Sequence, residues 1–433
     1  MPHPVATRAV VPVARPRISY RAAACVVTSV FFILGFITTL NDILVPHLRT
    51  AFTLTYTQAM LVQFTFFGAY LVVSLPAGKV VMRWGYQGAL VIGLLLSATG
   101  AVLFYPAASA QSYPMFLAAL FVLASGIVIQ QVAFNPFMSL LGPAETAASR
   151  MSLAHAFNSL GTTVAPAFGG LLILTRAPLT PEATSALPQQ ALEAYRLTEA
   201  HAVQGPYLGI ACVLVLIAVV LRCWPMPDFV REARASGTSS GMFAPLRRQH
   251  LRLAVVAIFF YVGAEVAIGS FMVNYLARSD MGGFSHTHAA YALSLYWGGA
   301  MIGRFVGAGL LRRIAPGRLL GTFAVCAGLL VLTSALGQGW LAIVAIIAVG
   351  LFNSIMFPTI FSLGVADLKG LTPQASSLIG LAIVGGAIVP LTQGVIADHW
   401  GLKLALTVPI ICYGYIAYFG FKGSKPRASD ALP

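Results

Sequence analysis

Long apolar runs separated by short polar breaks fill most of the chain. A helix needs about 20 apolar residues to cross a bilayer, and the chain contains twelve runs of roughly this length. They are residues 22–46, 57–80, 87–108, 113–141, 150–174, 206–225, 251–276, 287–310, 317–337, 339–365, 374–397 and 402–421. The runs are continuous and rich in Leu, Ala and Gly, whereas a transmembrane β-strand alternates over about ten residues. The pattern predicts an all-α membrane protein with twelve transmembrane helices.

Weak internal similarity relates the two halves of the chain. Four motifs recur in the same order at nearly constant spacing: FFILG (31–35) as FFYVG (259–263), GKVVMR (78–83) as GAGLLR (307–312), NPFMSLLG (135–142) as FPTIFSLG (357–364), and GTTVAPAFGG (161–170) as GGAIVPLTQG (385–394). The shared order predicts a duplicated six-helix unit, and an even number of helices gives both copies the same orientation. Two parallel bundles with a substrate site between them are typical of secondary transporters.

Polar segments complete the predicted organisation. The stretch between the sixth and seventh apolar runs is polar, contains Gly, Ser and Pro, and has basic ends, as a linker between bundles would. We expect a cytoplasmic N-terminal tail (1–20), an N-terminal bundle (21–225), a cytoplasmic linker (226–250), a C-terminal bundle (251–421) and a cytoplasmic C-terminal tail (422–433). The other long loop, 175–205, is expected to face outward.

The net charge of +14 is distributed unevenly across the predicted membrane. With the N-terminus placed inside, twenty of the 26 Lys and Arg residues fall on the inner side and five on the outer side. This asymmetry follows the positive-inside rule, so it accounts for the charge without a nucleic-acid partner. Only 9% of the residues are charged, against roughly 25% in soluble domains. We therefore expect the chain to be surrounded by lipid, and we further expect a monomer in a bacterial inner membrane.

Signatures of enzymes and ATP-driven pumps are missing from the sequence. The five cysteines show no paired or metal-ligand spacing, and no GxxxxGK[ST] phosphate loop is found. We expect neither an enzyme nor a cofactor or metal centre. The energy for transport would come from an ion gradient, with the proton as coupling ion and sodium as the alternative, or the protein would only equilibrate its substrate.

Two acidic residues lie within predicted transmembrane helices, where charged groups are rare and usually functional. Glu265 is about fourteen residues into its segment, roughly 21 Å deep at 1.5 Å per residue. It is a candidate proton-coupling group, or else a structural partner for a buried base such as Arg304. Asp42 lies 21 residues beyond Arg21, about 32 Å along a straight helix. At that depth it either has a task inside or is simply hydrated at the outer surface.

Amides and aromatic residues on other helices predict a polar cavity. Amides both donate and accept hydrogen bonds, which suits hydroxyl groups, and aromatic rings could stack on the apolar face of a sugar. Helix–helix hydrogen bonding and core packing are the alternatives for each residue. The candidate substrate-binding residues are Asn41, Gln63, Gln131, Asn135, His155, Asn158, Tyr261, Asn274, Trp297 and Asn353.

Basic residues near the expected inner ends of the helices form a third group. The segments GKVVMRWG and GAGLLRRIAPGR occupy corresponding places in the two halves. We interpret Lys79, Arg83 and Arg312 as candidate gating residues, and Arg304 as a gating or pairing residue. Anchoring at the membrane surface explains the first three equally well, and packing is the alternative for Arg304.

Several motifs together resemble one known family. They are LNDILVPHL, GAYLVVSLPAGKVVMRWGYQGALVIGLLL, LFYPAA, ASGIVIQQVAFNPFMSLLGP, LAHAFNSLGTTVAPAFG, YVGAEVAIGSFMVNYL and MFPTIFSLG. As a set they resemble the fucose–galactose–glucose:proton symporter family, a branch of the major facilitator superfamily, from about residue 20 to residue 420. The resemblance implies twelve helices in two six-helix bundles, with the sugar held between them.

The resemblance also implies roles for particular residues. Asp42 matches an essential membrane carboxylate of the family, and Asn158 matches the asparagine of its FNS motif. A second carboxylate of the fucose-transporting members is replaced here by Gln131, whereas Glu265 stands where those members have an amide. His155 replaces a glutamine at their sugar cavity. These departures make the chain more similar to the glucose/galactose and N-acetylglucosamine branches.

Taken together, the sequence predicts a proton-coupled importer of a neutral monosaccharide of the glucose/galactose type, working by alternating access. Asp42 and Glu265 are the candidate coupling residues. The alternatives are a sodium-coupled or uncoupled carrier of another sugar, such as N-acetylglucosamine, fucose, fructose, mannose or sucrose. A drug exporter and a sugar sensor are further alternatives, although the predicted tails are short for a signalling domain.

The charge asymmetry leads to a test of topology. Single cysteines placed in the segments 226–250 and 175–205 should react with an impermeant thiol reagent from opposite sides of the membrane. Reaction of both from the same side would contradict the twelve-helix arrangement.

Overall fold

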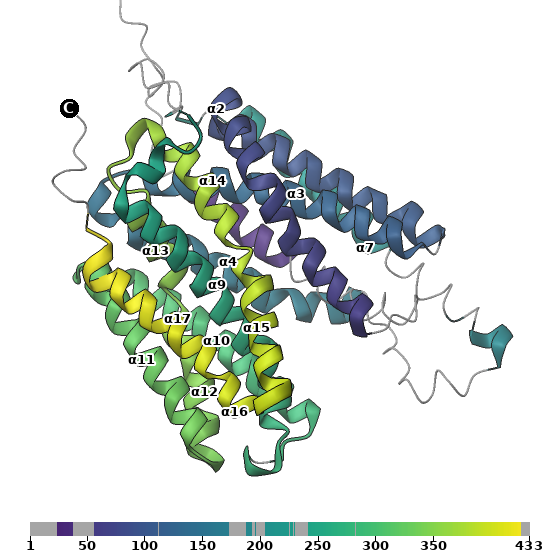
Figure 1. Ribbon diagram of the computed structural model, residues 1–433. Helices are drawn as coiled ribbons and strands as arrows, with labels where there is room; N and C mark the ends of the chain where they lie inside the picture. Colours follow the sequence, from purple (N-terminus) through teal and green to yellow (C-terminus); the bar gives the residue numbers. More distant parts are fainter. Residues whose placement is uncertain are drawn as a thin grey trace, which may run out of the picture.

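A computed structural model describes residues 24–37, 56–110, 112–172, 188–192, 195, 204–224, 226–227, 229, 241–281 and 283–425. The described part is almost entirely helical and contains no strand. The elements that cross the predicted membrane form two groups, one from each half of the chain (Figure 1).

The N-terminal group contains a helix over Ala24–Ile37 and four longer helical elements: α2 (Tyr56–Ser109), α3 (Tyr113–Leu140), α4 (Ala147–Leu172) and α7 (Gln204–Cys223). Element α2 is two membrane helices joined at Gly85, whose φ of 72° and ψ of 176° are not helical. A positive φ is readily adopted only by glycine. Gly85 therefore makes the turn between the second and third predicted segments.

The C-terminal group begins with the linker-side turn η2 (Ala244–Arg247). It then contains α9 (Gln249–Leu276), α10 (His286–Leu310), α11 (Pro316–Leu336), α12 (Gly339–Asn353), α13 (Met356–Gly364), α14 (Thr372–Ala382), α15 (Gly385–Trp400), α16 (Leu402–Ala405), α17 (Thr407–Tyr418) and the π-helical turn η5 (Phe419–Gly423). Short 3-10 turns η1 (Ala144–Thr146), η3 (Ser279–Met281) and η4 (Lys369–Leu371) connect neighbouring helices.

Every predicted segment coincides with a helical tract, so the twelve-helix prediction is confirmed. The first segment, 22–46, is described only as far as Ile37. The tenth, eleventh and twelfth segments are each interrupted, between α12 and α13, between α14 and α15, and between α16 and α17. Within the described ranges, eight helical runs are long and apolar enough to cross a membrane, and one of them, Phe64–Ser109, contains two segments.

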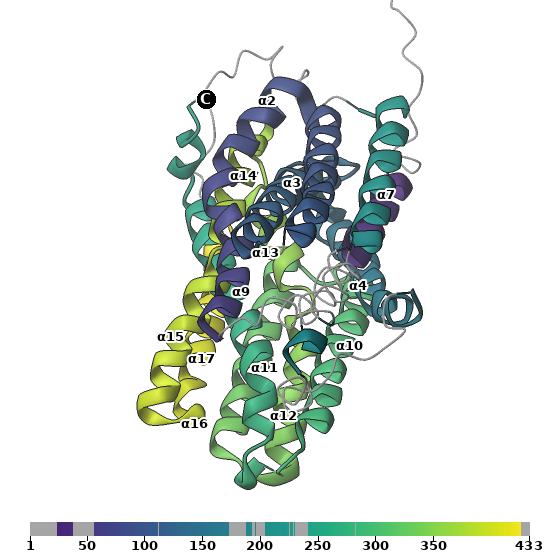
Figure 2. The ribbon, with the colours of Figure 1, turned by 90° about the vertical axis from the view of Figure 1, so that its right-hand side faces the viewer.

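The two groups of helices converge at one end and diverge toward the other (Figure 1). The end where they converge is the one at which α3 and α10 finish and α4 and α9 begin. We call it the inner end, after the side on which the basic residues were predicted. There α14 packs against α2 and α3, and α4 packs against α10 (Figure 2).

Small residues form part of the contact between the bundles at the inner end. The Ser149 hydroxyl donates to the Ala308 carbonyl at 2.7 Å, and the Ser376 hydroxyl donates to the Val132 carbonyl at 2.8 Å. A side chain at Gly78 would begin within 2.9 Å of the Ser377 side chain, so the backbones approach closely. Hydroxyl–carbonyl bonds and close backbone approach at glycine therefore join the bundles at this end, beside apolar contacts.

Glycine also sets the packing inside the N-terminal bundle. A Cβ at Gly126 of α3 would lie 2.4 Å from the backbone nitrogen of Ser97 in α2. Gly126→Ala should therefore force the two helices apart and lower the free energy of unfolding by about 1–3 kcal/mol, the usual cost of overpacking. Gly209→Ala in α7 is the matched control, because nothing lies within 4 Å of its added methyl group. Thermal unfolding in detergent measures both, and equal effects would refute the close α2–α3 contact.

Candidate functional site

A largely buried acid and its partners lie in the C-terminal bundle at the contact with the N-terminal one. The Tyr261 hydroxyl donates to Glu265 Oε1 at 2.7 Å, one helical turn away on α9. Arg304 of α10 places its Nη2 atom 3.8 Å from the same carboxylate oxygen, and both charged side chains are 14% exposed. The structure thus pairs Glu265 with Arg304, which is the alternative to a coupling role that the sequence predicted for Glu265. The pairing does not test whether Glu265 takes part in coupling.

Arg304 reaches across to the other bundle as well. Its Nη1 atom donates to the hydroxyl of Ser159 on α4. The Ser159 hydroxyl in turn donates to the carbonyl of His155 at 3.1 Å, so its oxygen remains free to accept. The backbone carbonyl of Arg304 accepts a hydrogen bond from the Ser152 hydroxyl at 3.0 Å. One residue of the C-terminal bundle is therefore bonded twice to α4.

A proline explains the remaining contact of Arg304. Its Nε atom donates to the carbonyl of Ser354 at 3.3 Å. In a regular helix that carbonyl would accept from the residue four positions later, which here is Pro358, and proline has no N–H to donate. The break between α12 and α13 thus supplies a carbonyl that the guanidinium uses.

The facing side of the N-terminal bundle carries a second polar group. Gln131 Nε2 donates to the Tyr70 hydroxyl at 3.4 Å, and Asn135 Nδ2 donates to Gln131 Oε1 at 3.2 Å. Asn135 is buried, and its Oδ1 atom has no partner among the described residues. The amides open into a small cavity between the bundles, lined by Gln131, Val132, Asn135, Phe357, Phe361, Ser376, Ile379, Gly380 and Ile383.

Aromatic rings connect the two polar groups. The ring of Phe357 lies 5.2 Å from the imidazole of His155 and 6.3 Å from the ring of Tyr261. Phe357 also lines the cavity that contains Gln131 and Asn135. Asn135 and Phe357 are the first residues of the repeated motifs NPFMSLLG and FPTIFSLG. The structure therefore brings equivalent positions of the two halves into one cavity.

Three further predicted residues have contacts that explain them structurally. Asn353 is fully buried and donates to the Tyr296 hydroxyl at 2.7 Å, which joins α12 to α10. Asn158 Nδ2 donates to the carbonyl of Phe31 at 2.9 Å, which joins α4 to the helix Ala24–Ile37. Trp297 is 41% exposed and packs edge-on against Tyr296 at 5.1 Å. None of these contacts tests a role in binding.

Other predicted residues lie apart from this cluster or outside the described residues. Asn274 is exposed near the end of α9. Lys79, Arg83 and Arg312 are exposed near the inner end, and Arg83 lies over the ring of Trp84 at 5.8 Å. Asn41 and Asp42 lie outside the described residues, as does the side chain of Gln63. Of the predicted gating residues, the structure brings only Arg304 into the contact between the bundles.

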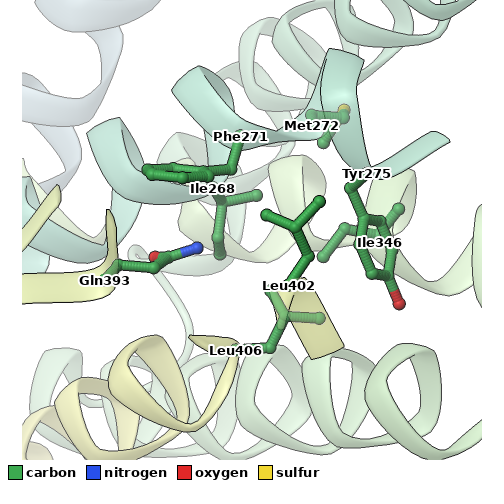
Figure 3. Close-up of a pocket in the computed structure, with 8 residues that line it drawn as sticks. All are labelled: Ile268, Phe271, Met272, Tyr275, Ile346, Gln393, Leu402 and Leu406. Atoms are coloured by element: carbon green, nitrogen blue, oxygen red, sulfur yellow. The ribbon is translucent and has the colours of Figure 1, made fainter. Parts of the chain in front are cut away.

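A second cavity lies within the C-terminal bundle. Its lining residues are Ile268, Phe271, Met272, Tyr275, Ile346, Gln393, Leu402 and Leu406 (Figure 3). Gln393 is fully buried and points its amide into this cavity, where neither amide atom has a partner among the described residues. An unpaired buried amide costs about 1–3 kcal/mol, so this site could accept water or a small polar group.

The fold and the site define a membrane protein of two pseudo-symmetric helical bundles with a polar centre between them. The profile of the Major Facilitator Superfamily matches residues 27–390, and the chain belongs to this family. It is 49% identical over 407 residues to a glucose/galactose transporter of Brucella abortus biovar 1, covering 94% of this chain and 95% of the relative.

Two further comparisons concern a proton-coupled relative. The chain is 35% identical over 407 residues to an L-fucose-proton symporter of Escherichia coli, with 93% of each chain covered. A crystal structure described as the major facilitator transporter FucP in the outward conformation superposes with a TM-score of 0.85 at 35% identity. That comparison covers 93% of this chain and 98% of the solved one. The twelve-helix major facilitator fold predicted from the sequence is thus confirmed.

Sequence reasoning missed Ser159 and Phe357 as parts of this site. Ser159 follows Asn158 in the FNS motif, and a serine in a membrane helix resembles many others that bond only to their own backbone. Phe357 could have been found from the internal repeat, because it occupies the position of Asn135 in the second half. The change from an amide to a phenyl ring concealed the equivalence.

The Asn158 contact leads to a prediction. Asn158→Ala removes a side-chain hydrogen bond between two helices and should lower the free energy of unfolding by about 0.5–1.5 kcal/mol. If Asn158 also contacts the ligand, as the sequence predicts, ligand binding should weaken by about 1–3 kcal/mol. Thr162→Ala is the control, because the Thr162 hydroxyl bonds only within α4, to the Ser159 carbonyl at 2.7 Å. Unchanged affinity in a folded Asn158→Ala protein would remove this residue from the binding site.

Proposed function

We propose that this protein is a secondary active transporter that imports a neutral hexose of the glucose/galactose type together with protons. The observation that carries the proposal is a largely buried carboxylate, Glu265, at the contact between the two bundles. Relatives of the chain are named as sugar transporters. Transport would proceed by alternating access, with the bundles rocking about a central site.

The chemistry of the central cavity supports a sugar as substrate. The Gln131 and Asn135 amides can donate to and accept from hydroxyl groups, and Asn135 Oδ1 is unused among the described residues. Phe357 presents an aromatic surface to the same cavity. A sugar ring offers hydroxyl groups at its edge and an apolar C–H face, so an amide side and an aromatic side complement it.

The arrangement of the bundles supports a conformation open to the outside. The bundles are bonded at the inner end and diverge toward the other end, and the similar FucP structure is described as outward. In this proposal the inner end faces the cytoplasm of a bacterial cell, both termini are cytoplasmic, and the protein works as a monomer in lipid. Substrate and proton would enter from the diverging side.

Asp42 and Glu265 are the residues we propose for coupling. A carboxylate that binds a proton loses its charge, which lowers the cost of occluding it in an apolar surrounding. Moving one charge through 100 mV releases about 2.3 kcal/mol. Since about 1.4 kcal/mol corresponds to a factor of ten, one proton would support a sugar gradient of roughly fifty-fold.

Purified protein in proteoliposomes tests the proposal. An inward proton gradient should drive accumulation of glucose or galactose. N-acetylglucosamine, fucose, fructose, mannose and sucrose in a competition panel then define the substrate. Uptake that follows a sodium gradient instead would identify a sodium symporter, and equilibration without accumulation would identify an uncoupled carrier. Export of lipophilic cations, or sugar binding without flux, would overturn the proposal.

Amide variants test the coupling residues. Asp42→Asn and Glu265→Gln nearly conserve shape and mimic the protonated state. The variant of a coupling residue should retain sugar counterflow but lose accumulation against a gradient and the pH dependence of uptake. We expect this outcome for at least one of the two, and for Asp42 in preference. Full uphill uptake would exclude that acid from coupling, and loss of counterflow would assign it to binding or structure.

A further inference from the structure

Arg304 is placed to transmit the charge state of Glu265 to the contact between the bundles. Its guanidinium lies between an acid of its own bundle and the Ser159 hydroxyl of the other. Its backbone carbonyl accepts from Ser152, and Ser149, one turn nearer the start of α4, bonds to the Ala308 carbonyl. The guanidinium is thus the part of the α4–α10 contact that touches an ionisable group.

We propose that Arg304 is a positioning residue that keeps the bundles together at the inner end while Glu265 is ionised and releases them when Glu265 binds a proton. The inference rests on the proposed function, because it concerns how proton loading permits the inner end to open. The link between proton binding and opening runs from Glu265 through Arg304 to Ser159.

The physical reason is the permanent charge of the guanidinium. Arginine does not lose its proton in proteins, so a proton on Glu265 leaves a buried positive charge without its counter-ion. An uncompensated charge in a low-dielectric surrounding is strongly unfavourable. Arg304 is then more stable in water than between the bundles, and opening of the inner end gives it that access. The step is a proton binding to a carboxylate, and no covalent bond in the protein changes.

Other ionisable groups surround this pair. Tyr261 on α9, Tyr296 on α10 and Tyr413 on α17 lie within electrostatic reach of Glu265, and His155 on α4 lies within reach of Arg304. Helices α13 and α14 carry no titratable side chain, and the titratable residues of α15 are at its far end. Phenols ionise far above physiological pH. The imidazole of His155 is therefore the competing pH-sensitive group.

The inner end contains a natural reporter position. Ala148 on α4 is 3% exposed and packs in a small apolar cluster with Leu311, Leu319 and Ile355 of the other bundle. A cysteine at Ala148 adds one sulfur atom and reacts with maleimide only after the bundles separate. Gly309 on α10 is exposed, with nothing within 4 Å of an added Cβ. A cysteine there reports the intrinsic pH dependence of the thiol reaction.

The experiment measures maleimide labelling of Ala148→Cys relative to Gly309→Cys. Both are made in a full-length chain whose five native cysteines are replaced by alanine, purified in detergent. As the pH falls, the relative labelling rate should rise. In Glu265→Gln the relative labelling rate should be high at every pH. Ser159→Ala should raise the relative labelling rate at high pH. A roughly tenfold increase is expected, since losing one charge-assisted hydrogen bond from the closed state changes the equilibrium by about that factor.

Three further variants isolate the path from Glu265 to Ser159. Thr162→Ala removes a hydroxyl that bonds within α4, and its labelling should match that of the parent protein. His155→Gln should retain the pH dependence, because the proposal assigns the response to Glu265. Arg304→Lys keeps the charge but loses the planar fork that reaches Glu265 and Ser159 together. It should label as fast as Ser159→Ala at high pH.

The outcomes distinguish this inference from the proposed function. Labelling that is independent of pH in the parent protein, or unchanged by both Glu265→Gln and Ser159→Ala, would overturn the link even if sugar counterflow is intact. If His155→Gln loses the pH dependence of labelling and Glu265→Gln retains it, His155 is the responding group and the inference is also overturned. If no sugar is transported but the labelling responds as expected, the proposed function fails and the Arg304 link stands.

Discussion

Lipid offers no hydrogen bonds, so each backbone group that crosses the bilayer has to be satisfied within the protein. Helices do this for most of the chain, but Pro136 and Pro358 each leave one carbonyl without its helical donor. The Val132 carbonyl, four residues before Pro136, accepts from Ser376 across the bundle contact. The Ser354 carbonyl, four residues before Pro358, accepts from Arg304. Satisfying these two carbonyls helps to determine where the bundles meet and where the guanidinium lies.

The two halves use equivalent positions for different purposes. Asn135 contributes an amide to the central cavity, whereas Phe357 contributes a ring at the same place in the second half. The two halves carry similar motifs at this place, yet the N-terminal half contributes amides to the cavity and the C-terminal half contributes a ring. A cavity with this asymmetry matches a ligand with hydroxyl groups on its edge and an apolar face, which is the chemistry of the proposed sugar.

In the proposed transport cycle the contact between the bundles opens repeatedly, so it has to be specific without being strong. Single hydroxyl–carbonyl bonds such as Ser149 to Ala308 contribute about 0.5–1.5 kcal/mol each, and the close approach at Gly78 requires no interlocking side chains. The ion pair of Arg304 with Glu265 differs from these contacts because its strength depends on a proton. Weak bonds between the bundles at the inner end, with one ionisable pair beside them, would allow proton binding to shift the equilibrium between the closed and open contact.

Hydropathy along the chain is a local property, so the sequence by itself determined the number of helices. Short motifs indicated the repeat between the halves, and polar residues within the apolar runs gave the candidate site residues. The apolar runs indicated a turn between residues 80 and 87, but they did not show the breaks before α13 and α15. A break depends on which groups the freed backbone atoms bond to, and those groups lie on other helices. The pairing of Glu265 with Arg304 was foreseen as an alternative, since both are charged residues in predicted helices. The bond from Arg304 to Ser159 joins residues 145 positions apart in different bundles. Only the tertiary structure decided that contact, because it depends on how α4 and α10 pack and not on the pattern of either helix.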